Sequence, residues 1–226
     1  PGPDSTPTTG TLSGPPRSTS FHPASPVQPL TTQLLEIGTG ILARVPEIFR
    51  QQFGTDTPAL IVSDPRTHAA AGRRVAEALR EAGVPLEPGL LLTDPHLHAE
   101  WRFVEAVEGA LTNSRAIPVA VGSGTINDLV KLAAHRTGRQ YLAVATAASM
   151  DGYTAFGASI TYRGSKQTFD CPAPVAVVAD LEVLCAAPPE LSAAGYADLL
   201  AKVPAGADWI LADELEIEPI DPTAWA

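Results

Sequence analysis

The chain has 226 residues, of which 45% are hydrophobic and 18% are charged, a composition typical of a soluble globular protein with one domain and part of a second. Its 15 Lys and Arg residues against 25 Asp and Glu residues give a formal charge of −10, which argues against a nucleic-acid partner because phosphate backbones are bound by clustered positive charge. No stretch approaches the roughly 20 apolar residues that cross a bilayer, so we expect no membrane span.

Residues 1–30 are rich in Pro, Ser, Thr and Gly and contain few aliphatic side chains. Such a segment cannot bury enough apolar surface to offset the entropy lost on ordering, so we expect a disordered tail.

The two cysteines of the chain, Cys171 and Cys185, do not form a Cys-x-x-Cys pair. We interpret them as small buried or half-buried apolar residues rather than as a disulfide or metal ligands. This use of cysteine favours a reducing, cytoplasmic compartment.

Between residues 31 and 186, short apolar runs alternate with longer amphipathic segments, which is typical of parallel βαβ units. The pattern predicts strands at Leu34–Gly38, Ala59–Ser63, Leu90–Leu92, Ile117–Val121, Tyr141–Ala145 and Val175–Ala179. It predicts helices at Ile41–Gln52, His68–Ala82, Pro95–Leu111 and Ile126–His135, the third of them capped by Asp94. We therefore predict an α/β fold with a Rossmann-like, doubly wound parallel sheet that binds a dinucleotide.

From residue 187 onward the sequence becomes helical, with predicted helices at Pro188–Ala201 and Asp208–Leu215 and no further strand. The last residues, 222–226, contain no cap or closing element. We expect residues 187–226 to begin an all-helical second domain that is incomplete.

A glycine turn, Gly122-Ser123-Gly124-Thr125, joins an apolar strand to a helix. Glycines let the main chain approach a pyrophosphate, and the N–H groups of a helix start can face an anion. The third glycine of the pattern G-x-G-x-x-G is replaced by Asn127, so the turn alone fits a simple strand-to-helix connection equally well.

Three segments together resemble a known family: Gly-Ser-Gly-Thr-Ile-Asn-Asp at 122–128, Thr-Ala-Ala-Ser-Met-Asp-Gly-Tyr at 146–153 and Ala-Ala-Gly-Tyr-Ala-Asp-Leu-Leu at 193–200. They resemble the sn-glycerol-1-phosphate dehydrogenases, which belong to the superfamily of iron-containing alcohol dehydrogenases and dehydroquinate synthases. The order and approximate spacing of the segments match, and the resemblance extends from Leu34 to the last residue.

The resemblance implies that the chain binds NAD or NADP and a divalent metal ion, often zinc. It implies a pyrophosphate site at Gly122, Ser123, Gly124, Thr125 and Ile126, and a nicotinamide site along Thr146, Ala147, Ala148 and Ser149. Asp151 would contact the substrate, and Asp198 would bind the metal. The implied reaction is the reduction of dihydroxyacetone phosphate, a small phosphorylated triose, to sn-glycerol 1-phosphate. Without the resemblance, Asp198 would be interpreted as a solvated helix residue and Asp151 as a turn residue.

Two positions depart from the family pattern. Ala155 stands where some members have a serine that contacts the cofactor. The two metal-binding histidines of the family lie well beyond Asp198, whereas this chain has no histidine after His135. His96 and His98 are two residues apart on a predicted helix of the nucleotide domain, so we do not expect them to replace those ligands. We therefore expect the 226 residues alone to be inactive.

Asp64 follows the predicted strand Ala59–Ser63. Its carboxylate could accept hydrogen bonds from the adenosine ribose, which would favour NAD over NADP, or it could cap the next helix. Both interpretations remain open at this point.

Two other functions are compatible with the sequence. One is a dehydrogenase of glycerol or another polyol within the same superfamily. The other is a cofactor-binding remnant without catalysis, since the implied metal ligands are incomplete. A homo-oligomer is also possible.

Overall fold

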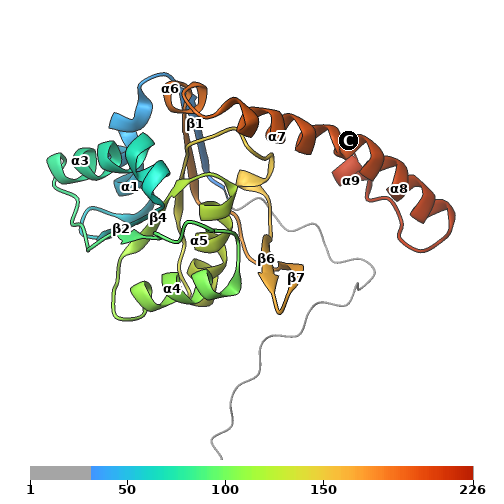
Figure 1. The fold of residues 1–226 in the computed structure, drawn as a ribbon, viewed down its shortest axis with the longest axis horizontal. Helices are drawn as coiled ribbons and strands as arrows, with labels where there is room; N and C mark the ends of the chain where they lie inside the picture. The colour runs from blue at the N-terminus through green and yellow to red at the C-terminus, as the bar shows by residue number, and fades with distance from the viewer. Residues whose placement is uncertain (1–31, 226) are drawn as a thin grey trace, which may run out of the picture.

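The computed structural model describes residues 32–225, so the predicted tail at residues 1–30 lies outside the described part. Six parallel strands form one sheet in the order β1-β8-β5-β4-β2-β3 (Figure 1). Their bounds are β1 Leu34–Gly38, β2 Ala59–Ser63, β3 Leu90–Leu91, β4 Ile117–Gly122, β5 Leu142–Ala145 and β8 Ala176–Asp180. All six were predicted, and the doubly wound α/β fold is confirmed.

Helices cover both faces of the sheet (Figure 1). On one face lie α4 (Trp101–Thr112) and α5 (Gly124–Arg136), and on the other lie a 3-10 turn η1 (Ile41–Arg44), α1 (Val45–Phe53) and α3 (Arg73–Glu81). Along β2, Leu60 and Val62 join the first core while Ala59 and Ile61 join the second. Because both faces are buried, the strands are continuous apolar runs rather than alternating ones.

The winding of the chain reverses between β2 and β4. After β2 the chain passes through α2 (Pro65–Thr67), a π-helical turn η2 (His68–Gly72) and α3 on one face, whereas after β4 it enters α5 on the other. Connections that leave neighbouring strands toward opposite faces open a crevice at the carboxyl ends of those strands, where such sheets bind ligands. The glycine turn lies at this position.

The helix predicted from Pro95 begins instead at Trp101. Asp94 caps only a turn, accepting from the His96 amide at 2.8 Å, and its carboxylate also pairs with Arg102 at 3.1 Å. The Ala99 carbonyl accepts a hydrogen bond from the amide of Thr161 at 2.7 Å, so this stretch pairs with a distant strand. His96 and His98 therefore lie in a loop, and the prediction that placed them on a helix was wrong.

A β-hairpin between β5 and β8 was not predicted. Its strands are β6 (Ala158–Tyr162) and β7 (Ser165–Phe169), joined through Arg163 and Gly164, which both have positive φ. Such two-residue turns match the twist of a hairpin. Tyr162 packs on Trp101 of α4 with ring centroids 4.8 Å apart, which anchors the hairpin to the body.

Three helix starts also differ from the predictions. The predicted helix His68–Ala82 begins earlier, at Pro65, because Asp64 caps it there. The helix predicted from Ile126 begins at Gly124, directly after the glycine turn. The helix predicted from Asp208 is α8 (Lys202–Glu214) and follows α7 (Pro189–Leu200) almost without a break.

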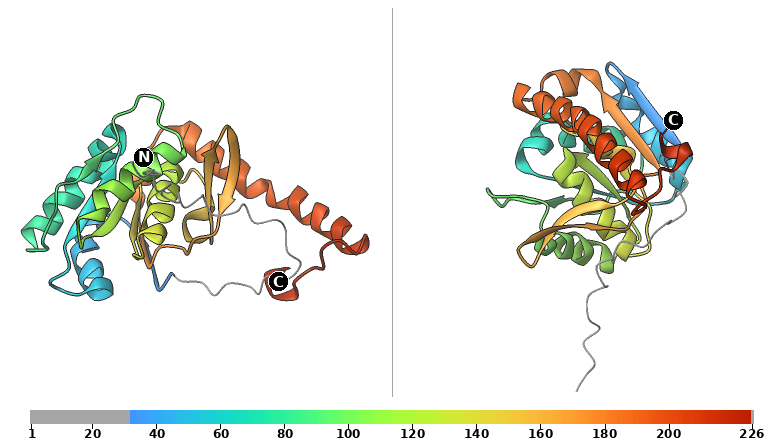
Figure 2. Two further views of the ribbon diagram at one scale, coloured as in Figure 1. Left: turned by 90° about the horizontal axis from the view of Figure 1, so that it is seen from below. Right: turned by 90° about the vertical axis from the view of Figure 1, so that its right-hand side faces the viewer.

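The C-terminal part is helical, as predicted, and includes α6 (Leu181–Cys185) and α9 (Pro222–Trp225) besides α7 and α8. Helices α7 and α8 project from the body as an arm (Figures 1 and 2). The proposed domain boundary at residue 187 stays a prediction. Within residues 32–225, no helix combines the length and apolarity that crossing a bilayer requires.

The two cysteines differ in environment. Cys171 is fully buried, as expected. Cys185 is exposed, so the expectation of a buried or half-buried residue was wrong for it. The reason is that the short α6 directs only Val183 into the core.

Candidate functional site: the crevice beside the glycine turn

The glycine turn presents a helix start to the crevice. Strand β4 ends at Gly122, Ser123 has extended backbone angles at the N-cap, and α5 begins at Gly124. The first N–H groups of a helix have no acceptor within the helix, and the Ser123 side chain makes no capping bond to them. The helix dipole adds partial positive charge here, so an anion can be bound by the main chain.

Glycines let the three sequence motifs approach one another closely. A Cβ on Gly124 would lie 2.8 Å from the sulfur of Met150, in the second motif. A Cβ on Gly195, in the third motif, would overlap the carbonyl oxygen of Ala148. The loop Thr146–Asp151 is therefore held between the start of α5 and the helix α7, and the structure brings all three motifs together.

Tyr153 ties the first two motifs together. Its hydroxyl donates a hydrogen bond to the carbonyl of Ala147 at 2.8 Å and lies 3.5 Å from the carbonyl of Gly122. Burial raises the pKa of Tyr153 to about 12, so the hydroxyl stays protonated and remains a donor at neutral pH. The amide of Thr146 also donates to the Gly122 carbonyl, at 3.1 Å.

Asp151 and Asp198 lie next to each other. The Asp198 carboxylate accepts a hydrogen bond from the main-chain amide of Asp151 at 3.0 Å, and this bond lowers the pKa of Asp198. Lys202 on α8, which sequence reasoning did not single out, pairs with the Asp151 carboxylate at 3.2 Å. Asp198 is thus ionised and available at the surface.

Metal-ligating side chains do not cluster in the described part of the chain. Within residues 32–225 there is no group of three or more His, Cys, Asp or Glu residues that could hold a metal ion. The Asp198 carboxylate can supply one oxygen ligand to a cation, but residues 32–225 do not complete a metal site.

Asp64 caps the helix that follows it. Its carboxylate accepts from the amides of Arg66 at 2.8 Å and Thr67 at 3.0 Å, and the Thr67 hydroxyl donates to it as well. The capping interpretation is therefore confirmed, and the ribose contact stays a prediction.

The other predicted cofactor residues differ in accessibility. Gly122, Ile126, Thr146 and Ala147 are buried, and Ile126 belongs to the core between the sheet and α4. Ser123, Gly124, Thr125 and Ser149 are half-buried, and Ala148 is exposed. The buried residues shape the turn, whereas the accessible ones can face a ligand.

A cavity of about 380 Å³ opens beside the start of α5. It is lined by His98, Ala99, Gly124, Thr125, Asp128, Ser159, Thr161 and Lys166. Only Gly124 and Thr125 were predicted from the sequence. Ser159, Thr161 and Lys166 come from the hairpin, which thus adds a cation to the cavity that the start of α5 also lines.

The sequence model described as iron-containing alcohol dehydrogenase matches residues 36–188. The chain belongs to this family. It is also 36% identical over 203 residues to a glycerol-1-phosphate dehydrogenase (NAD(P)+) of Bacillus licheniformis, covering 87% of this chain and 49% of the relative. A protein of the same name from Methanosarcina barkeri is 37% identical over 182 residues, covering 80% of this chain and 50% of that relative.

Solved structures of dehydrogenases are similar to this chain in fold. An NADH-dependent butanol dehydrogenase of Thermotoga maritima matches with a TM-score of 0.67 at 17% identity, covering 80% of this chain and 50% of that one. A glycerol dehydrogenase of Schizosaccharomyces pombe matches with a TM-score of 0.64 at 19% identity, covering 75% of this chain and 42% of that one. The chain spans about half the length of the curated relatives that it matches.

Proposed function

We propose that this chain is the nucleotide-binding part of an NAD(P)-dependent dehydrogenase that reduces dihydroxyacetone phosphate to sn-glycerol 1-phosphate. The observation that carries the proposal is that the glycine turn, the loop Thr146–Asp151 and Asp198 meet at one crevice. The names of the relatives that share more than a third of their aligned residues with the chain support the same activity.

The first turn of α5 would hold the cofactor pyrophosphate through main-chain N–H groups. Lys166 lines the adjoining cavity and would add a positive charge to the anion site. Ser149 and the exposed Ala148 would lie along the nicotinamide, and Asp64 would favour the unphosphorylated ribose of NAD. The bound cofactor supplies the hydride; the protein supplies its orientation.

Asp151 would orient the substrate hydroxyl groups by charge-assisted hydrogen bonds, since its carboxylate lies at the surface beside Lys202. Asp198 would be one ligand of a divalent metal ion, for which we propose zinc, whose role when bound is to polarise a carbonyl. The remaining ligands are not gathered among residues 32–225. A cytoplasmic location and a homo-oligomeric state stay predictions.

Cofactor binding can be tested by titrating the chain with NADH and with NADPH and following nicotinamide fluorescence. We expect binding of both, with NADH tighter. Gly124→Val would place a side chain against Met150, and we expect it to weaken NADH binding by about tenfold or more, equivalent to about 1.4 kcal/mol.

Gly109→Val is a matched control, because Gly109 lies on the exposed side of α4 with open space around it. Its NADH affinity should stay within about twofold of the unmodified chain, which is less than about 0.5 kcal/mol. If the unmodified chain binds neither cofactor, the proposed function is wrong. Tighter NADPH binding would count against the role of Asp64.

A further inference from the structure

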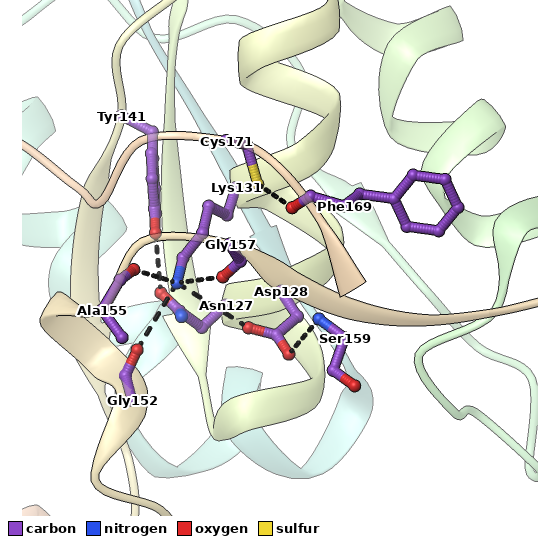
Figure 3. Close-up of polar contacts among 10 residues, drawn as sticks. All are labelled: Asn127, Asp128, Lys131, Tyr141, Gly152, Ala155, Gly157, Ser159, Phe169 and Cys171. Atoms are coloured by element: carbon purple, nitrogen blue, oxygen red, sulfur yellow. Dashed lines mark hydrogen bonds and ion pairs between the residues drawn. The ribbon is translucent and has the colours of Figure 1, made fainter. Parts of the chain in front are cut away.

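Lys131 is a charged side chain buried in the interior, only 1% exposed. Its ammonium group donates to the carbonyl oxygens of Ala155 at 2.8 Å, Gly157 at 3.0 Å and Gly152 at 3.4 Å (Figure 3). Burial lowers the pKa of Lys131, because desolvation disfavours its charged form. A buried cation is tolerated when hydrogen bonds replace its hydration, and here three carbonyls do so.

Asp128 lies one turn earlier on α5 and bonds to the same stretch of chain, the segment from Gly152 to Ser159. Its carboxylate accepts from the amide of Ser159 at 3.2 Å and lies 4.0 Å from the Lys131 ammonium (Figure 3). One side of α5 therefore bonds four main-chain groups between Gly152 and Ser159. The first part of this segment has only the short turn η3 (Gly152–Thr154), so the helix side chains supply partners that a sheet ladder would otherwise supply.

The segment joins two parts of the crevice. Asp151 immediately precedes it, and Ser159, which closes it, lines the cavity with Thr161 and Lys166 farther along the hairpin. The same helix that carries Lys131 presents its N-terminal turn to the cofactor site. The contacts from the middle of α5 to this segment therefore connect that turn to the chain between Asp151 and the hairpin.

We propose that Lys131 is a positioning residue that fixes Asp151 and the cavity wall against the start of α5 through its three carbonyl bonds. The role rests on the proposed function, because it concerns the geometry of the cofactor crevice. Lysine suits it, since an ammonium group has three donors in a tetrahedral arrangement, whereas a guanidinium group is a planar fork.

A matched control exists at the opposite end of the sheet. Arg139 also donates to three carbonyls, those of Leu111, Ser114 and Ala116, before the start of β4. Lys131→Met and Arg139→Met each remove one cation and three main-chain bonds. Only the first should affect the crevice.

The test combines hydrogen exchange by mass spectrometry with NADH titration, at a temperature where circular dichroism shows both variants folded. In Lys131→Met we expect amide exchange in residues 152–159 to rise about tenfold or more and NADH affinity to fall by about tenfold. In Arg139→Met both quantities should stay within about twofold of the unmodified chain. Lys131→Arg keeps the charge, but it should restore neither the slow exchange of residues 152–159 nor the NADH affinity fully.

Unchanged exchange in residues 152–159 of Lys131→Met would overturn the proposal. Equal losses of NADH affinity in Lys131→Met and Arg139→Met would also overturn it, because they would show a general effect on stability. If Lys131→Met does not fold, the same measurements on Lys131→Arg decide between these outcomes. If the unmodified chain binds no NADH, the proposed function fails, and the exchange measurement still decides whether Lys131 fixes the segment.

Discussion

At the scale of single residues, the crevice depends on buried and half-buried polar groups that bond main-chain atoms. Tyr153, Lys131 and Asp128 all bond to main-chain carbonyls or amides. The hydrogen bonding of each group depends on its protonation state. Burial favours the neutral form of each, so it raises the pKa of Asp128 and Tyr153 and lowers the pKa of Lys131. We therefore expect the stability of these loops to depend on pH.

Tyr153 gives a test of this dependence. Burial raises its pKa from 10.0 to about 12 in the folded chain, so its contribution to stability is present below pH 10 and is lost as the pH rises through 12. In Tyr153→Phe this loss disappears. We expect the free energy of unfolding of the unmodified chain to fall between pH 10 and 12 more than that of Tyr153→Phe, with the difference approaching roughly 3 kcal/mol.

Urea unfolding at several alkaline pH values measures this difference. Burial raises the pKa of Tyr141 in both proteins, so its effect cancels. Parallel pH profiles would show that burial does not raise the pKa of Tyr153 in the folded chain.

At the scale of elements, the contact between α7 and the loop Thr146–Asp151 sets the geometry of the two aspartates. Gly195 allows this contact, and the amide of Asp151 bonds Asp198 one turn later on the same helix. In Gly195→Val the helix must move away from Ala148. The bond from the Asp151 amide should then break, and the pKa of Asp198 should rise toward its ordinary value.

NMR titration of the Asp198 carboxyl carbon measures this change. Ala194→Val is the control, because Ala194 is an exposed neighbour on the same helix. We expect its Asp198 pKa to equal that of the unmodified chain. The same pKa in Gly195→Val would contradict the assigned contact.

The elements also show how far the sequence determines the structure. Strands β2 and β4 were predictable because a buried parallel strand is a continuous apolar run. The hairpin was not, because Ser165–Phe169 is mostly polar and its position depends on packing against Trp101, more than 60 residues earlier. The glycine turn could be found from its motif, whereas Lys166 reaches the cavity only through that hairpin.

At the scale of the whole molecule, apolar side chains are exposed along the arm of helices. The exposed fraction is 73% for Val203, 58% for Leu199 and 58% for Leu211. Exposed apolar surface of this kind favours association in water. We expect the chain to self-associate at micromolar concentration, and the double variant Leu199→Glu with Leu211→Glu to be mostly monomeric.

Sedimentation velocity distinguishes the self-associated unmodified chain from the monomeric double variant. Leu35→Glu is the control, because Leu35 is 54% exposed but lies on the edge strand β1 rather than on the arm. It should associate like the unmodified chain. A monomeric unmodified chain would contradict the expectation, and loss of association in Leu35→Glu would place the contact at the sheet edge.

The different environments of the two cysteines make the protein chemically addressable at one site. Cys171 is fully buried and burial raises the pKa of its thiol to about 12, so it has almost no thiolate at neutral pH. Cys185 is exposed at the end of α6, where the chain leaves the sheet and approaches the helical arm. A maleimide dye would thus attach at this junction without any engineering of the sequence, and its fluorescence would respond to changes in the surroundings of this junction.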